Sequence, residues 1–332
     1  MSHSDDAFAP VTFLTIKKAH VVAKDGGRAR FTKDFQKRLV YSALNILHPR
    51  EEFPEDGMVE DLQGSHICEQ DLVATGTKAF KPKPPHVYNC EDIVAISGTL
   101  LSNPADISIE EEVRLTMSQI EELLHDAGLD WDHVILMHVY VSDMWLFGKI
   151  NSAYSSFFKI NPPPRVTVQV NLPGQHRVQI DSLANRTPKE TLHVQSISYW
   201  AAANIGPYAQ ACRMNDQVFM AGQIGLVPQS MTLQPTLSNQ TRSSLSNLKS
   251  VNEVMGSEPV GCIGYVTDAL HISKAKTAWD YTCPCLIVVV PHLPKSALVE
   301  WQAFNGKNIS DVAMDRSSEG NTSRRASHVS RI

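Results

Sequence analysis

Alternating apolar and polar residues are clearest at residues 161–173, which read NPPPRVTVQVNLP. The three prolines end any preceding helix, and the alternation after them predicts a β-strand. One face of this strand is apolar: Val166, Val168 and Val170. The opposite face carries Arg165, Thr167 and Gln169. An arginine there fits either an exposed strand edge protected from aggregation or a ligand-binding position, and both interpretations stay open at this point.

The segment from Asp92 to Phe158 follows a readable order of elements. Residues 92–97 predict a strand, and Ser108 with Glu111 fits a capping box at the start of a helix that runs to about Ala127. Strand 133–143 and helix 144–158 follow, before the proline-led strand and a last strand at 177–184. The predicted helix 108–127 carries apolar residues at three- and four-residue spacing: Val113, Met117, Ile120, Leu124 and Ala127.

The same order of elements recurs later in the chain. IVAISGTL at 93–100 is echoed by VFMAGQIG at 218–225, and VILMHVYVSD at 134–143 by CIGYVTD at 262–268. Asp143 lies 45 positions after Gly98, and Asp268 lies 46 positions after Gly222. A repeat this long is typical of two similar globular domains in tandem.

The domain boundaries follow from this repeat and from composition. Residues 78–86, KAFKPKPPH, have the proline and lysine content of a solvated linker, and the C-terminal residues are rich in serine and arginine. The predicted organisation is a short N-terminal segment 1–30, a linker 31–86, domains 87–186 and 194–304, and a disordered tail 305–332.

Composition narrows the classes of function. The 332 residues are 42% hydrophobic and 20% charged, which is typical of a globular protein. The formal net charge of -5 does not favour nucleic acid as a partner, and no apolar run approaches the roughly 20 residues needed to span a membrane. The six cysteines are scattered, which disfavours a metal site. We expect a cytoplasmic protein with no membrane partner.

Five blocks, in the same order in both copies, resemble the reactive-intermediate deaminase family, also called RidA, YjgF or L-PSP-type domains. They include NIGPYAQAC at 204–212, DAGLDWDHV at 126–134, VYVSD at 139–143 and PPPRVTVQVNLP at 162–173. The resemblance implies an α+β fold of the chorismate-mutase-like kind, in which a mixed sheet is backed by helices. It also implies trimer-like self-association, with a small carboxylate-bearing ligand bound at a cleft between domains.

The N-terminal SHSDDAFAPVTFLTIKKAHVVAK resembles the closing segment of the ATP-dependent domain of eukaryotic diphthine-ammonia ligases, which carry two deaminase-like domains after it. The resemblance implies ATP-dependent amidation of diphthine on elongation factor 2, with that factor as a possible partner. The Ser-Gly-Gly-x-Asp-Ser loop of such ligases does not occur in the chain. We therefore expect a truncated gene model or a short isoform, with no cofactor in this chain and ATP needed only by the missing domain.

The resemblance to the deaminases also implies site residues. Arg165 matches the arginine that binds the substrate carboxylate, and Tyr208 matches the tyrosine near the imine. Asp181 matches the acidic residue that positions water for hydrolysis of an enamine or imine to a keto acid and ammonia. The second copy has Cys285 at the arginine position and Gln302 at the acidic position.

Neither copy therefore holds a complete set of these residues, and three functions stay open. The chain is an accessory half of a diphthine-ammonia ligase, a free-standing imine deaminase, or a non-catalytic oligomerisation module. A composite site with Arg165 facing Tyr208 favours the second, whereas two degenerate scaffolds favour the third.

Overall fold

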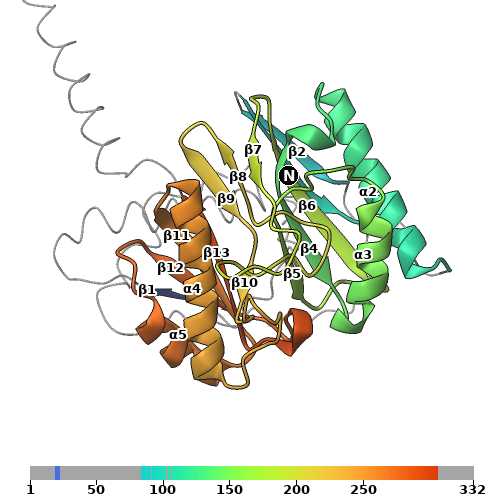
Figure 1. Ribbon diagram of the computed structural model, residues 1–332. Coiled ribbons are helices and arrows are strands. Elements are labelled where there is room, and N and C mark those ends of the chain that lie inside the picture. Colours follow the sequence, from blue (N-terminus) through green and yellow to red (C-terminus); the bar gives the residue numbers. More distant parts are fainter. Residues whose placement is uncertain (1–18, 23–83, 91, 102–103, 105, 306–332) are drawn as a thin grey trace, which may run out of the picture.

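The computed structural model describes residues 19–22, 84–90, 92–101, 104 and 106–305 (Figure 1). Most of the predicted N-terminal segment and linker, and the tail from residue 306, lie outside the described residues. The described part forms two α+β halves, each with a mixed sheet and two helices. The predicted fold class is therefore confirmed, and no described helix is long and apolar enough to cross a membrane.

The first half has a five-stranded sheet with the order β2-β3-β6-β4-β5. Strands β4 and β5 are parallel, and the other neighbours are antiparallel. Two helices, α2 and α3, cover the outer face of this sheet (Figure 1). The elements are β2 His86–Cys90, β3 Ile93–Thr99, α2 Ile109–Asp126, β4 Val134–Val141, α3 Phe147–Ser155, β5 Arg165–Gln169 and β6 Val178–Asn185.

The second half repeats this plan. Its sheet has the order β1-β12-β11-β13-β9-β8-β7, with β10 paired to β13, and β11 and β12 are its parallel pair. Strand β1, Ala19–Val22, comes from far upstream and pairs antiparallel with β12. The other elements are β7 Glu190–Leu192, β8 Ala211–Met214, β9 Gln217–Met220, β10 Gln223–Ile224, α4 Leu237–Met255, β11 Pro259–Val266, α5 Ile272–Ala278, β12 Cys285–Val289 and β13 Val299–Asn305.

Helix α2 forms where the apolar stripe predicts it. Ser108 is the N-cap, and its side chain accepts a hydrogen bond from the Glu111 backbone N at 3.1 Å. The carboxylate of Glu111 accepts from Arg114 at 2.8 Å, and the Ser108 half of the predicted capping box forms without the reciprocal bond. Met117, Ile120 and the rest of the stripe are buried against the sheet.

The two sheets pack face to face, with the helices on the outside (Figure 1). Val166, Val168 and Tyr140 of the first half share one buried cluster with Tyr265 and Leu286 of the second. A smaller cluster joins Leu183 and its neighbours to Cys212 and Met214. The apolar face predicted for residues 166–170 therefore faces the other domain, and burial of these side chains holds the two halves together.

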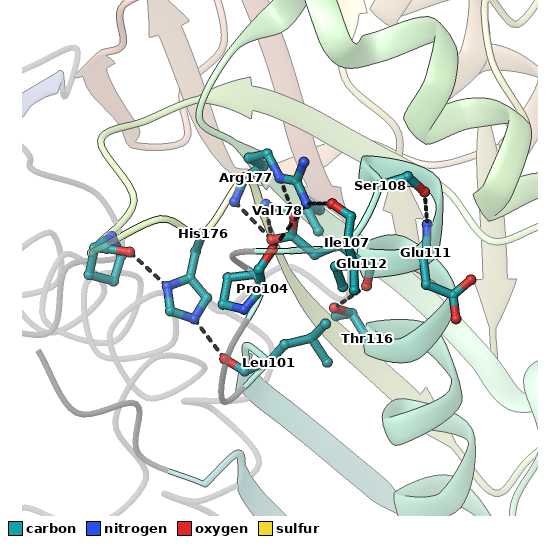
Figure 2. A network of polar contacts seen from close by, with 11 residues as sticks. Leu101, Pro104, Ile107, Ser108, Glu111, Glu112, Thr116, His176, Arg177 and Val178 are labelled. Atoms are coloured by element: carbon teal, nitrogen blue, oxygen red, sulfur yellow. Dashed lines mark hydrogen bonds and ion pairs between the residues drawn. The ribbon is translucent and has the colours of Figure 1, made fainter.

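A partly buried ion pair links the start of α2 to the start of β6 (Figure 2). Glu112 accepts from the Nε of Arg177 at 2.6 Å and from the Arg177 backbone N at 2.8 Å. The same guanidinium donates to the Ile107 carbonyl at 2.8 Å, and the His176 ring bridges the carbonyls of Pro173 and Leu101. These bonds tie the loop after β3 to the start of β6.

Candidate active site between the two domains

Arg165 is the first residue of β5, directly after the prolines. Because Val166 and Val168 of this strand face the second sheet, the Arg165 side chain lies on the opposite face, toward α3. Its backbone also contacts the second domain, because the Gly222 N–H donates to the Arg165 carbonyl at 3.2 Å. Arg165 therefore lies at the edge where the two halves meet.

The guanidinium of Arg165 is buried, with 3% of the residue exposed. Its NH2 group donates to Asn151 Oδ1 at 2.7 Å. The Cζ atom lies 4.7 Å from the ring centroid of Tyr154, 5.6 Å from that of Tyr208 and 5.7 Å from that of Phe147. Such contacts stabilise a cation, although burial still lowers the pKa of Arg165. The buried NH1 group has no hydrogen-bond partner among the described residues, and the Tyr154 hydroxyl beside the guanidinium acts to keep it charged.

The second domain supplies Tyr208 from a loop that is held by its own hydrogen bonds. Asn204 Nδ2 donates to the Gly206 carbonyl at 2.6 Å, and the Ile205 N–H donates to the Tyr208 hydroxyl at 3.3 Å. A Cβ on Gly206 would lie 2.8 Å from NH2 of Arg165, so only glycine allows this close approach. Burial raises the pKa of Tyr208 to about 12.

Glu300 on β13 is the acidic group of this site. It is 4% exposed, and its Oε1 lies against Gly222, whose N–H contacts the Arg165 carbonyl. Burial raises the pKa of Glu300 to about 8, although the Arg165 charge acts in the opposite direction. Its Oε2 has no hydrogen-bond partner among the described residues. At neutral pH this carboxyl therefore retains a proton that it can transfer.

Two of the three predicted site residues, Arg165 and Tyr208, come together across the domain interface. Asp181 does not join them. It is the register partner of His138, whereas Arg165 is the partner of Met137, so the two side chains lie on opposite faces of the sheet. Asp181 Oδ1 instead accepts from the Gly98 N–H at 2.7 Å, and burial raises the pKa of Asp181 to about 7.

In the second copy an amide, Gln302, occupies the position expected for the acid, and an acid lies two residues away. Gln302, at the expected acidic position, contacts His138 and Tyr265 instead of Arg165. Glu300, two residues earlier on the same face of β13, is the acid whose charge interacts with Arg165. Sequence did contain a signal, because β6 reads Gln179-Ile180-Asp181 and β13 reads Glu300-Trp301-Gln302. The acid changes place between the copies.

Cys285, at the arginine position of the second copy, packs in the core of its own domain as the register partner of Cys262. Cys212, Cys262, Cys283 and Cys285 are all free and buried. Within the described ranges, no group of three or more His, Cys, Asp or Glu side chains could hold a metal ion.

The arrangement suits a small anion whose reaction requires proton transfer. A guanidinium with a free N–H binds one carboxylate, and a protonated carboxyl beside it donates to an adjacent atom. Each half supplies what the other lacks, with Arg165 and Asn151 from the first domain and Tyr208 and Glu300 from the second.

Comparison with known proteins identifies relatives of both kinds suggested by the sequence. Residues 79–185 and 200–306 match the family model described as Endoribonuclease L-PSP. The diphthine-ammonia ligase of Schizosaccharomyces pombe is 32% identical over 249 residues, which cover 71% of this chain and 40% of that protein. The chain thus spans well under half of the length of this relative.

Two shorter proteins match about one domain. The human 2-iminobutanoate/2-iminopropanoate deaminase is 32% identical over 96 residues, covering 29% of this chain and 67% of that protein. The crystal structure of RidA from an Antarctic Psychrobacter species is 24% identical and covers 35% of this chain and 98% of that chain, with a TM-score of 0.32. The predicted resemblances to diphthine-ammonia ligases and to RidA-like proteins are confirmed.

Proposed function

The chain belongs to the endoribonuclease L-PSP family, and we propose that its two family domains act as the accessory half of a diphthine-ammonia ligase. The supporting observation is the alignment with the S. pombe ligase, which extends over 249 residues and is too long to be confined to one domain. ATP-dependent amidation of diphthine on elongation factor 2 would then take place outside these two domains, because the chain has no Ser-Gly-Gly-x-Asp-Ser loop.

Complementation of a ligase-null yeast strain tests this proposal. One strain expresses this chain alone, and a second expresses it together with the yeast ligase truncated before its own two related domains. Mass spectrometry of elongation factor 2 measures the diphthamide formed. We expect amidation in the second strain and none in the first. Amidation by this chain alone, or no gain over the truncated ligase alone, would contradict the accessory role.

The site itself favours a second candidate, the hydrolysis of a 2-imino acid. The free NH1 of Arg165 would bind the carboxylate, which places the imine carbon near Tyr208 and Glu300. Glu300 gives its proton to the imine nitrogen as water adds to that carbon, one water proton passes to the nitrogen, and the other returns to the Glu300 carboxylate as the C–N bond breaks to give a 2-keto acid and ammonia. Glu300 is the proton donor in this step, and the similarity to the human 2-iminobutanoate/2-iminopropanoate deaminase supports it.

Ammonia release from 2-aminoacrylate, generated in place from serine by a dehydratase, tests this second candidate. Arg165→Ala should lower the rate of ammonia release at saturating 2-aminoacrylate by about 100-fold, because the group that binds the substrate carboxylate is lost. Arg114→Ala is the matched control, since Arg114 is an exposed arginine that pairs only with Glu111. A wild-type rate equal to the uncatalysed rate would reject hydrolysis and leave the accessory role standing.

Self-association separates these proposals from a non-catalytic oligomerisation module. We propose a trimer-like assembly, measured by sedimentation equilibrium. A module without catalysis would assemble unchanged after Arg165→Ala and would release no ammonia in either form.

A further inference from the structure

The two copies carry the same pair of side chains in opposite order. Strand β6 has the amide Gln179 first and the acid Asp181 second, whereas β13 has the acid Glu300 first and the amide Gln302 second. The neighbouring strand has a tyrosine at the same register in both copies, with Tyr140 opposite Gln179 and Tyr265 opposite Glu300. Comparing the two copies shows which of the two positions the tyrosine hydroxyl lies beside.

In both copies the tyrosine hydroxyl is engaged with the second position. Tyr265 donates to Gln302 Oε1 at 3.1 Å. Tyr140 lies beside Asp181: burial raises the pKa of that carboxyl, and the Gly98 N–H, Gln179 and, least of the three, Tyr140 act to lower it. The order of acid and amide therefore decides whether the tyrosine lies beside an acid at the second position, as in the first domain, or donates to an amide there, as in the second.

The Gln302 amide is held in place from the other domain. Its Oε1 lies 3.0 Å from His138 Nε2, and Gln302, Tyr265 and His138 are 0%, 2% and 8% exposed. Burial lowers the pKa of His138, so the ring is neutral; with Gln302 Oε1 as the acceptor, the tautomer that fits has its proton on Nε2. A carbonyl oxygen has two acceptor positions, and the donors from Tyr265 and His138 occupy both.

Three groups other than Gly222 face Glu300: Arg165 from β5, Tyr265 from β11 and Tyr208 from the loop before β8. Neither phenol donates to Glu300 Oε2, which has no hydrogen-bond partner among the described residues, and Tyr265 donates to Gln302. We propose that Gln302 is a positioning residue for the Glu300 acid: its carbonyl, fixed by His138, retains the Tyr265 hydroxyl and so leaves the Glu300 carboxyl without a phenolic donor.

The consequence is that Glu300 stays protonated at neutral pH. A phenol that donated to this carboxyl would stabilise the ionised form and lower its pKa, as hydrogen bonds to carboxylates do. The catalytic value of this effect rests on the proposed imine hydrolysis, because only a protonated carboxyl can donate to the leaving nitrogen. The control of protonation by Gln302 does not rest on that activity and is measurable without it.

Infrared titration of the Glu300 carboxyl in the full chain tests the proposal, with a Glu300→Gln difference spectrum to assign the band. In Gln302→Met the side chain keeps its length but has no acceptor, so Tyr265 becomes free to donate to Glu300. The midpoint should move about one pH unit toward acid, a tenfold change in proton affinity. The double variant Gln302→Met/Tyr265→Phe should return to the wild-type midpoint. Gln179→Met, the same change in the first domain, should leave it unmoved.

A Gln302→Met midpoint equal to wild type in a folded protein would overturn the proposal, as would a shift that persists in the double variant. Gln302→Asn keeps the amide but shortens its reach, so it should shift the midpoint in the same direction and serves if Gln302→Met does not fold. If imine hydrolysis is present, the pH profile of the rate should shift with the infrared midpoint. If it is absent, the titration alone decides the role of Gln302.

Discussion

Glu300 and Gly222 lie so close that no other residue fits at the glycine. A Cβ added to Gly222 would stand 1.7 Å from Glu300 Oε1 and 2.6 Å from its Cδ. Both atoms belong to a buried carboxyl, and the Gly222 N–H is bonded to the Arg165 carbonyl, so neither partner can move without disturbing the site. Gly222 therefore sets the position of the acid relative to the guanidinium.

The first prediction follows from this contact. Gly222→Ala should displace the Glu300 carboxyl and weaken binding of pyruvate, used as a carboxylate probe, by at least tenfold in isothermal titration calorimetry. Gly148→Ala is the matched control, since Gly148 is in α3 and nothing lies within 4 Å of its added Cβ. That variant should bind pyruvate as wild type does and gain up to about 1 kcal/mol of unfolding free energy. Equal binding by both variants would contradict the assignment.

The second prediction concerns pH. Burial raises the pKa of Glu300 to about 8 and that of Asp181 to about 7, above the ordinary values of 4.5 and 3.8. Between the ordinary and the raised pKa of each carboxyl, the folded state binds more protons than the unfolded state. Both groups therefore make the free energy of unfolding fall as pH rises. The fall is at most about 1.4 kcal/mol per pH unit for each group.

Urea unfolding of Glu300→Gln and wild type from about pH 5 to 8 measures the effect of Glu300. The difference between the two proteins cancels the contribution of His138, whose lowered pKa acts in the opposite sense below its ordinary value of 6.5. We expect wild type to lose stability relative to the variant as pH rises through this range. A difference that does not change with pH would show that Glu300 titrates normally.

The third prediction compares two adjacent glutamates of α2. Glu112 is fully buried and accepts from Arg177 and two backbone N–H groups, so Glu112→Gln should lower the unfolding free energy by about 2–4 kcal/mol. Glu111 forms an exposed pair with Arg114, and Glu111→Gln should change it by no more than about 0.5 kcal/mol. Both values come from urea unfolding, and similar losses in the two variants would refute a structural role specific to Glu112.

The fourth prediction concerns the apolar stripe of the same helix. Ile120 is fully buried, and Ile120→Ala should cost about 2–5 kcal/mol of unfolding free energy. Leu115 is 43% exposed, and Leu115→Ala should cost less than about 1 kcal/mol. Thermal unfolding followed by circular dichroism ranks the two variants, and the reverse order would mean that α2 packs with a different face.

Local pattern was sufficient for the elements of the fold. The spacing of Val113, Met117 and Ile120 predicted α2 and its buried face, and the alternation after the prolines placed Val166 and Val168 on one apolar face. These signals are local because helix and strand periods are properties of neighbouring residues. The face-to-face packing of the two sheets, and the pairing of β1 with β12, depend on residues far apart in the chain and could not be read from it.

The candidate site was predicted in part for the same reason. Arg165 was identified from the PPPR block of the first copy and Tyr208 from the IGPY block of the second, and the structure brings them together. The acid was missed because Glu300 and Gln302 share a face of β13, so alternation cannot choose between them. Glu300 is distinguished from Gln302 by its contact with Gly222 and its charge interaction with Arg165, and such interactions depend on tertiary structure.

Covalent linkage of the two halves has an evolutionary consequence. In a symmetric ring of identical subunits, every substitution is repeated at each interface, so a residue needed at one position must be kept at all. A tandem chain escapes this constraint, because Arg165 and Glu300 each occur in one copy only and Cys285 and Gln179 fill the places left behind. The two copies thus contribute different residues to the candidate site between them.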